Sequence, residues 1–490
     1  MLKMSKITEK SEISGLFRSS TNILAACVIA LSFSAAGLPA EPLDLPGYLD
    51  LVKAGNADYG SALKSLVSSE AAASESRLLT TPYLFTGYQW ARDKSLLVDP
   101  SGTSGSNRLE TSFSIGVEAR TVIGLGGSVS FRSVFDSVDD LHLPMYPSSV
   151  EYYTPSLTFE LKQDLLRNFF GRETRAQRDA ILHAAAARTA LAEFQMRQIL
   201  SQAEILYWRT SLASEVVRVQ EDLLERSRRM LEWVSDRVDR QLQDLSDLLQ
   251  SQADVKFRTL ELESSRDDES RLRRAFSLMA GLSPSEPARE LRLPARADFV
   301  LPDGASNRIH RSDIRALEEM DAVYRMESVL KKESVTPTLS AFFSATWNGL
   351  ESDLDSAMKD VGKFKYDLLA AGIRLQAPFD LPSLFKLRKS YSADYESRRS
   401  TYRQRAADAE SERLELLARI PDMIERLKVS DELVKIQLWK ADNERDRLLK
   451  GNTVTLQVLL FEQDLGRSKL MRLDLQARLL EMLSRLRMYE

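Results

Sequence analysis

The residues that most often carry catalysis or bind metals are few and scattered in this chain. His142, His183 and His310 are its three histidines, and their spacing does not match a metal-binding motif. No Ser-His-Asp or Cys-His pattern is legible, and the many acidic residues alternate with basic ones in the manner of solvated helix faces. We therefore predict that the protein is not an enzyme, and that it uses no cofactor and no metal.

Phosphate and nucleic-acid binding are also disfavoured. The glycine-rich run at residues 124–127 has predicted strands on both sides, whereas a phosphate-binding loop must open a helix. The chain has 67 Lys and Arg against 71 Asp and Glu, a net charge of −4. It lacks the clustered basic footprint that nucleic-acid binding requires. We therefore expect no nucleic-acid partner.

Residues 1–40 have the pattern of a secretory signal peptide. Basic residues precede an apolar run at residues 23–38 and small residues follow, so cleavage is expected after Ala36 or Ala40. The run is shorter than the ~20 residues that a spanning helix needs. The only cysteine, Cys27, lies inside this run, so the mature chain has no thiol chemistry. The alternative is that the residues before Cys27 form a lipobox and that Cys27 is lipidated.

The rest of the chain is a duplicated unit, and repeats of this size mark a shared architecture. The break around Gln241 matches the break around Gly451 at an offset of 210 residues (451 − 241). Nearer the start, Thr81-Pro82 matches Thr336-Pro337 at an offset of 255 (336 − 81). Both halves therefore contain the same series of elements.

Hydrophobic periodicity and breaker residues predict the elements of each half. The first repeat spans residues 41–282, with a helix at 43–80, strands within 82–162, a long helix at 166–240 and a helix at 243–281. A proline-containing, irregular linker follows at residues 283–305 and is expected at mid-height of the helices. The second repeat spans residues 306–490, with a helix at 306–335, strands within 337–376, a long helix at 382–450 and a helix at 453–489.

The strands alternate apolar and polar side chains. In the second repeat, Leu339, Ala341 and Phe343 alternate with Ser340 and Ser344. Strands of ~10 alternating residues are typical of a membrane β-barrel, and aromatic residues near their ends favour a membrane interface. The alternative is one exposed sheet in a soluble domain.

The strand region of the first repeat is longer than that of the second. Pro82 and Gln163 are 81 residues apart in sequence (163 − 82), whereas Pro337 and Gln376 are 39 apart (376 − 337), a surplus of 42 in the first repeat (81 − 39). This surplus holds an extra hairpin at residues 111–135. We expect the hairpin to join the barrel wall, with an extracellular or plug-like position as the alternative. Three copies would then supply 18 strands instead of 12.

The long helices set the dimensions of the molecule. At 1.5 Å per residue each is about 100 Å long, roughly three times the hydrocarbon thickness of a bilayer. They must therefore stand in water, with apolar seams that pack as coiled coils. Each shorter helix is about half as long, so we expect two of them to stack end to end beside one long helix.

These features together resemble the TolC-like outer membrane efflux protein family, over residues 43–490. Its turn motif reads roughly Gly, two residues, Ser or Thr, and after two more residues Asp-Val-Leu. The second repeat matches at Gly451-Asn452-Thr453 and Val458-Leu459, with Gln457 at the acidic position. The first matches at Asp247-Leu248-Leu249, with Gln241 in place of the glycine. The run at residues 161–166 also resembles the family's end of the second strand.

The resemblance implies an α+β membrane protein built from a duplicated helix-strand-strand-helix-helix unit. Three copies would form a homotrimer, with an outer-membrane β-barrel continued by a long periplasmic α-helical barrel. It implies the exit duct of a tripartite efflux system or a type I secretion system. The implied partners are a periplasmic adaptor (membrane fusion) protein, an inner-membrane pump of RND or ABC type, and outer-membrane lipid. The implied location is the outer membrane, with a periplasmic extension.

The same resemblance implies roles for the two breaks. Together they would form the periplasmic tip that contacts the adaptor, through Arg240, Gln241, Leu242, Lys450, Gly451, Asn452 and Thr453. The pore constriction would be formed by Asp244, Asp247 and Gln457. Gly451 suits a break with positive φ, a role that Gln241 fills less easily.

The role of Asp247 has two interpretations. A ring of three Asp247 carboxylates would draw cations and oppose anions. An Asp near a helix start is also a common partner of the helix dipole.

The competing hypothesis is an exported periplasmic coiled-coil scaffold without a pore. The alternating strands favour the channel, because a scaffold does not need them. The transported substrate, the pump and the adaptor stay open.

Overall fold

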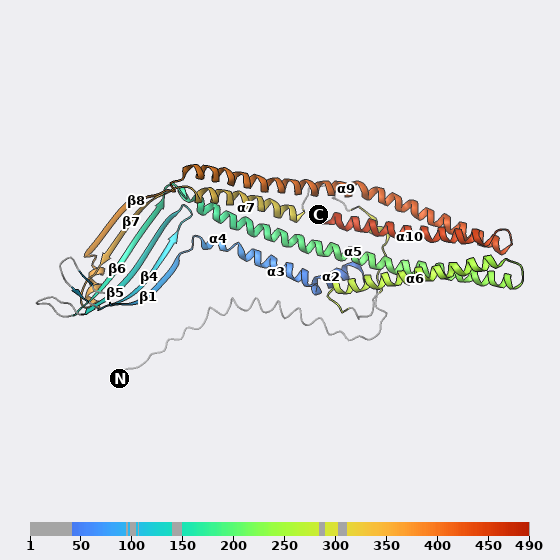
Figure 1. Cartoon of the computed structure of the whole chain (residues 1–490), viewed down its shortest axis with the longest axis horizontal. Helices are drawn as coiled ribbons and strands as arrows, with labels where there is room; N and C mark the ends of the chain where they lie inside the picture. Colours follow the sequence, from blue (N-terminus) through green and yellow to red (C-terminus); the bar gives the residue numbers. More distant parts are fainter. Residues whose placement is uncertain are drawn as a thin grey trace, which may run out of the picture.

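The computed structural model has a β-sheet at one end and long helices that run away from it (Figure 1). It describes residues 42–94, 97–98, 104–105, 107–139, 149–283, 290–301 and 311–489. The expected signal peptide and Cys27 lie outside these residues. Parts of the expected linker, and the first residues of the helix expected from residue 306, also lie outside them.

Two long helices form the frame, α5 (Arg172–Asp239) with 68 residues and α9 (Leu381–Leu449) with 69. Shorter helices lie end to end beside them, the first set along α5 and the pair α7 and α10 along α9 (Figure 1). Their bounds are α2 (Leu45–Gly55), α3 (Ala57–Ala72), α4 (Glu75–Leu78), α6 (Leu245–Met279), α7 (Ser312–Ser334) and α10 (Thr455–Leu486).

The helix expected at residues 43–80 is divided into α2, α3 and α4, so the prediction of one continuous helix was wrong. Asn56 ends α2 and begins α3 in an extended conformation, and its side chain accepts a hydrogen bond from the Tyr59 amide at 2.8 Å. Its Nδ2 donates to the carbonyl of Met279, at 2.9 Å. The break therefore lies where α2 meets the end of α6.

The ends of α2 and α6 are in backbone contact. Gly281 has φ +70°, and a side chain there would overlap the carbonyl of Gly55. Beside this contact, the rings of Tyr48 and Phe276 stack at 3.9 Å, and Tyr48 is fully buried. The main apolar core therefore lies at mid-height, where the short helices meet against α5 and α10.

The six longer strands form one antiparallel sheet in the order β1-β4-β5-β6-β7-β8. Their bounds are β1 (Tyr83–Asp93), β4 (Asn107–Arg120), β5 (Leu125–Asp139), β6 (Ser149–Asp164), β7 (Thr338–Asn348) and β8 (Tyr366–Gln376). A separate pair joins β2 (Leu97–Val98) to β3 (Ser104–Gly105). The extra hairpin, β4 with β5, is longer than the expected 111–135 and lies between β1 and β6. It is part of the sheet and not a plug.

The turn of the extra hairpin is Thr121–Gly124, and not the glycine-rich run at residues 124–127, most of which belongs to β5. The amide of Thr121 donates to the carbonyl of Leu125 at 2.8 Å, and Gly124 has φ +80°. The turn lies against the start of α5. A side chain at Gly171, where φ is +77°, would overlap the carbonyl oxygen of Val122.

The strand register gives the sheet one apolar and one polar face, because directly paired residues lie on the same face. The apolar face includes Tyr88, Phe113, Ile115, Val117, Val129, Phe131, Leu157, Phe159, Phe343, Ile373 and Leu375. The other face is mainly polar and includes Ser112, Ser114, Glu118, Ser130, Arg132, Thr158, Glu160, Ser344 and Thr346, together with the apolar Phe85, Phe342 and Leu368. Helices cover neither face along its length (Figure 1).

A short helix, α8 (Leu354–Gly362), joins β7 to β8 at the far end of the sheet and was not predicted. Asp353 caps it by accepting from the amide of Ser356 at 3.0 Å. Ala357 is buried where it crosses Gly349. Its nine residues include both acids and bases, and the segment is too short for its hydrophobic periodicity to distinguish a helix from a loop.

Candidate functional site

The two breaks between long and short helices lie together at the end of the molecule opposite the sheet (Figure 1). In the first, the amide of Gln241 donates to the carbonyl of Val238 at 2.9 Å, and that of Leu242 to Arg237 at 2.8 Å. In the second, Gly451 donates to Leu448 at 2.9 Å and Asn452 to Arg447 at 2.9 Å. Both are Schellman motifs, offset by 210 residues, so the repeat extends to single hydrogen bonds.

Gln241 and Gly451 are the left-handed residues of these motifs, with φ +57° and +75°. Gly451 was expected to have positive φ, and Gln241 has the same conformation although glutamine does not favour it. Arg240, Leu242, Lys450 and Asn452 are exposed beside them, and Thr453 is half-buried. These seven residues therefore lie at the same end of the molecule (Figure 1), and their contact with an adaptor stays a prediction.

The three expected constriction residues begin the short helices. Asp244 is the N-cap of α6, where its side chain makes no capping bond. Asp247 and Gln457 occupy the third position of α6 and α10, again 210 residues apart (457 − 247), and both are half-buried. Their common position also suits the dipole interpretation of Asp247.

A glutamine that the sequence analysis did not single out joins the two breaks. Nε2 of Gln243 donates to Oδ2 of Asp247 at 3.0 Å and to the hydroxyl of Thr455 on α10. Thr455 is buried, and the carbonyl oxygen of the Gln243 side chain is also buried, without a hydrogen-bond partner. The Asp247 carboxylate is therefore held toward the neighbouring helical hairpin through Gln243.

A second polar contact fixes the break after α9. The hydroxyl of Thr453 donates to Glu444, which is buried, and Arg447 bonds to Glu444 at 3.1 Å. Arg447 also donates to the carbonyl of Asn452 at 3.3 Å. Gln243 and Thr453 are equivalent in the repeat (453 − 243 = 210). Polar residues at both positions are the signal that could have found them.

An apolar cluster underlies these polar contacts. It combines Met230 and Val234 of α5 with Leu448 of α9 and Val458 and Leu459 of α10, all buried. The tip therefore has its own small core, in which side chains of both helical hairpins are shared.

A charged cluster links the hairpins further from the tip. Arg226 of α5 bonds to Asp442 of α9 at 3.2 Å and lies 3.5 Å from Glu462 of α10. Asp222 of α5 bonds to Lys469 of α10 at 2.7 Å. The cluster thus ties the first hairpin, α5 with α6, to both helices of the second.

Two carboxyls of this cluster, Glu462 and Asp222, have pKa values that are shifted in opposite directions. Burial raises the pKa of Glu462 above its ordinary value, although Arg226 opposes the shift. Burial also acts to raise the pKa of Asp222, but Lys469 and Arg226 outweigh it and hold that pKa below its ordinary value. Burial therefore disfavours the ionised form of Glu462, in contrast to Asp222.

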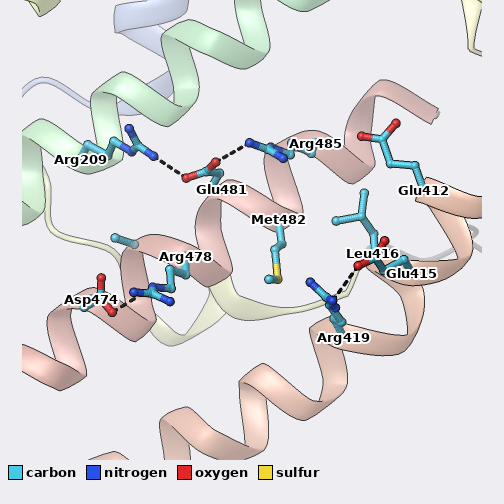
Figure 2. Close-up of a pocket in the computed structure, with 11 residues that line it drawn as sticks. Arg209, Glu412, Glu415, Leu416, Arg419, Asp474, Arg478, Glu481, Met482 and Arg485 are labelled. Atoms are coloured by element: carbon cyan, nitrogen blue, oxygen red, sulfur yellow. Dashed lines mark hydrogen bonds and ion pairs between the residues drawn. The ribbon is translucent and has the colours of Figure 1, made fainter. Parts of the chain in front are cut away.

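A groove of about 590 Å³ lies between α5, α9 and α10 at mid-height (Figure 2). Its wall carries paired charges, including Arg419 with Glu415 at 2.7 Å and Arg209 with Glu481 at 2.6 Å. Figure 2 shows Leu416 and Met482 between these pairs. Because the cations that line it are already paired with carboxylates, the groove offers no free charge for a ligand.

The described residues also bear on metal binding and on membrane-spanning helices. No group of three or more His, Cys, Asp or Glu in this part of the chain is placed to hold a metal ion. Among the same residues, no helix combines the length and the apolar character needed to cross a membrane.

Comparison with known proteins gives matches in structure and none in sequence. No family model and no curated protein matches the chain. The fold resembles the outer membrane protein VceC from Vibrio cholerae, with a TM-score of 0.65 and 16% identity over 91% of this chain and 95% of VceC. It resembles CusC with a TM-score of 0.65 and 14% identity, over 93% and 94%. It resembles the open state of the Neisseria gonorrhoeae outer membrane channel MtrE with a TM-score of 0.62 and 14% identity, over 93% of each chain. The chain therefore has the fold of the TolC-like outer membrane channels, which confirms the fold class expected from its sequence.

Proposed function

We propose that the protein is an outer-membrane channel, the passive exit duct of a tripartite efflux system or a type I secretion system. It would work as a homotrimer, with its sheets in the outer membrane and its helices in the periplasm. The exposed tip would contact a periplasmic adaptor protein, and an inner-membrane pump of RND or ABC type would supply the substrate. As a duct it would catalyse no reaction.

The two-faced sheet is the observation that carries this proposal. An outward apolar face and an inward face of hydroxyls and charges are the pattern of a membrane barrel around a water-filled lumen. The edge strands β1 and β8 have 11 residues each and, among the described residues, no strand pairs with their outer edges. Open edges are not stable in lipid, because their backbone groups lack hydrogen bonds. Pairing β8 of one subunit with β1 of the next removes both edges.

The helices also support association of several copies. On the half away from the sheet, α9 and α6 are the two outer helices (Figure 1). α9 exposes Val429, Ile436 and Trp439, the last at 76%. α6, the outer helix on the other side of the chain (Figure 1), exposes Phe257 and Leu260. Apolar stripes of this kind suit contact between the α9 of one subunit and the α6 of the next.

The extra hairpin sets the proposed size of the barrel. Because β4 and β5 belong to the sheet, three sheets of six strands give 18 strands (3 × 6). Barrel diameter grows roughly linearly with strand number, so the lumen would be about one and a half times as wide as that of a 12-stranded barrel.

The decisive experiment is single-channel recording of the detergent-purified mature protein in a planar bilayer. We expect small openings that prefer cations under a salt gradient, because Asp247 would lie close to the axis of the proposed trimer. Asp247→Asn should reduce this preference. Asp464→Asn, which removes a half-buried carboxylate of α10 that lies further from the tip and 3.5 Å from Lys440, is the matched control.

Each outcome separates the hypotheses. Openings that Asp247→Asn leaves unchanged would keep the channel and place the constriction elsewhere. A protein that never opens, even when both breaks are mutated to loosen the tip, would favour the periplasmic scaffold.

A further inference from the structure

The first nine residues of α9, Leu381–Lys389, have almost no neighbours in the chain. We call this segment the α9 start. Its side chains are exposed on all sides, with only Leu384 half-buried. Phe385 is 72% exposed and Phe379, just before the helix, is fully exposed. A stretch with this many uncovered apolar side chains needs an apolar partner.

The α9 start is also basic. Lys386, Arg388 and Lys389 lie in a stretch with no acidic residue between Asp380 and Asp394. In the described part of the chain, no ion pair is recorded for these three cations, whereas Asp394 pairs with Lys331 at 3.1 Å. Its partner must therefore combine apolar and anionic groups.

Position narrows the choice of partner. The α9 start follows β8, whose side chains Ile373 and Leu375 are exposed on the apolar face of the sheet. Figure 1 shows it at the junction of sheet and helices, on the outer side of the molecule. If the apolar face lies in a bilayer, this segment lies where that bilayer ends on the side of the helices.

We propose that the α9 start binds the headgroup region of the membrane leaflet next to the helices, with its cations on phospholipid phosphates. This inference rests on the proposed function. Phe379, Leu381 and Phe385 would enter the acyl boundary, while the longer basic side chains reach the phosphates. The segment would thereby fix how deep the barrel sits and select anionic phospholipids.

A neighbouring subunit is a less suitable partner for this segment. In the proposed trimer the edge beside it would be formed by residues 75–83, from α4 to the first residue of β1, in which Glu75 is the single acid. One carboxylate cannot neutralise three cations, and this edge can cover only one side of a helix that is exposed all round. The phospholipid leaflet meets both requirements.

The test uses the purified full-length protein and measures retained lipid by native mass spectrometry, after competition between phosphatidylglycerol and phosphatidylcholine. We expect the wild type to retain phosphatidylglycerol selectively. The triple variant Lys386→Gln, Arg388→Gln and Lys389→Gln should lose this selectivity by roughly 100-fold, since each Lys or Arg near an anionic surface contributes about fivefold.

A matched control removes the same charge from the same helix. Arg403→Gln, Arg405→Gln and Lys435→Gln alter exposed residues of α9 further from the sheet, and should leave lipid selectivity unchanged. Equal loss in both triple variants would mean that total charge binds the lipid, and would overturn the proposal.

Two further outcomes are decisive. Efficient disulfide formation between subunits in a Phe385→Cys, Leu78→Cys variant would show that the neighbouring subunit covers the segment, and would overturn the proposal. If the triple variant of the α9 start keeps its selectivity for phosphatidylglycerol, the proposal is also overturned. The channel hypothesis would be unaffected, because conductance is recorded separately. A wild type that forms no channel would overturn the proposed function and this inference together.

Discussion

Gln243→Ala tests how the tip of the molecule is held together. The substitution removes the hydrogen bond to Asp247 at 3.0 Å and the bond to the Thr455 hydroxyl. Each hydrogen bond contributes about 0.5–1.5 kcal/mol net. Only the bond to Thr455 joins the two hairpins, so each subunit loses about 0.5–1.5 kcal/mol of coupling between them. A change of this size shifts the equilibrium between a joined and a separated tip roughly 2- to 13-fold.

The shift can be measured in two ways. In planar bilayers, Gln243→Ala should open more often or conduct more than the wild type. In hydrogen exchange, the amides of Leu242 and Asn452, which donate within the two breaks, should exchange faster by a similar factor. The second measurement does not depend on channel activity.

A double-mutant cycle provides the control. Thr455→Val preserves shape while removing the hydroxyl, and combining it with Gln243→Ala should cost less than the sum of the single changes. Gln250→Ala, which alters an exposed residue of α6, should leave both measurements unchanged. Additive effects of Gln243→Ala and Thr455→Val, or unchanged exchange in both breaks, would refute the reasoning.

Three other predictions follow from single positions. Gly171→Ala should destabilise the protein by more than the ~1–2 kcal/mol that a left-handed conformation costs, because the new side chain would also overlap the Val122 carbonyl. Thermal unfolding measures this change, and a loss of stability below ~1 kcal/mol would contradict the prediction. Gln241→Gly should stabilise the tip by about 0.5–1 kcal/mol, because it removes the cost of a left-handed glutamine and adds the smaller entropy cost of glycine. A variant with a lower denaturation midpoint than the wild type would count against this prediction. Burial raises the pKa of Glu462, so its favourable contribution is present at acidic pH and is lost as pH rises through that pKa. Glu462→Gln should therefore match the wild type in thermal midpoint at pH 4 and exceed it at pH 7.5, and lower stability at pH 7.5 would show that the bond to Arg226 outweighs burial.

Strong, long periodicities made most of the fold predictable from the sequence. The repeat placed both breaks, and the 3.6- and 2-residue periods distinguished helices from strands. α8 was missed because nine residues carry too little pattern. The division of the helix at residues 43–80 was missed because Asn56 makes its decisive bond to Met279, more than 200 residues away in sequence.

The candidate site was less predictable for the same reason. Gly451 indicates a left-handed turn by its residue type, whereas Gln241 adopts the same turn without that indication, with φ +57°. The bond from Gln243 to Thr455 spans 212 residues. The sequence around Gln243 does not predict this contact. Only the equivalence of Gln243 and Thr453 in the repeat marks Gln243 as a candidate for a structural role.

The extra hairpin also shows how the dimensions of such a molecule can vary. β1 runs away from the helices and β6 runs back toward them, so the two are antiparallel whether or not β4 and β5 stand between them (Figure 1). Adding a pair of strands therefore preserves the direction of every flanking strand and the number of helices. In the proposed trimer, the circumference of the barrel would therefore change in steps of two strands per subunit, independently of the number of helices below it.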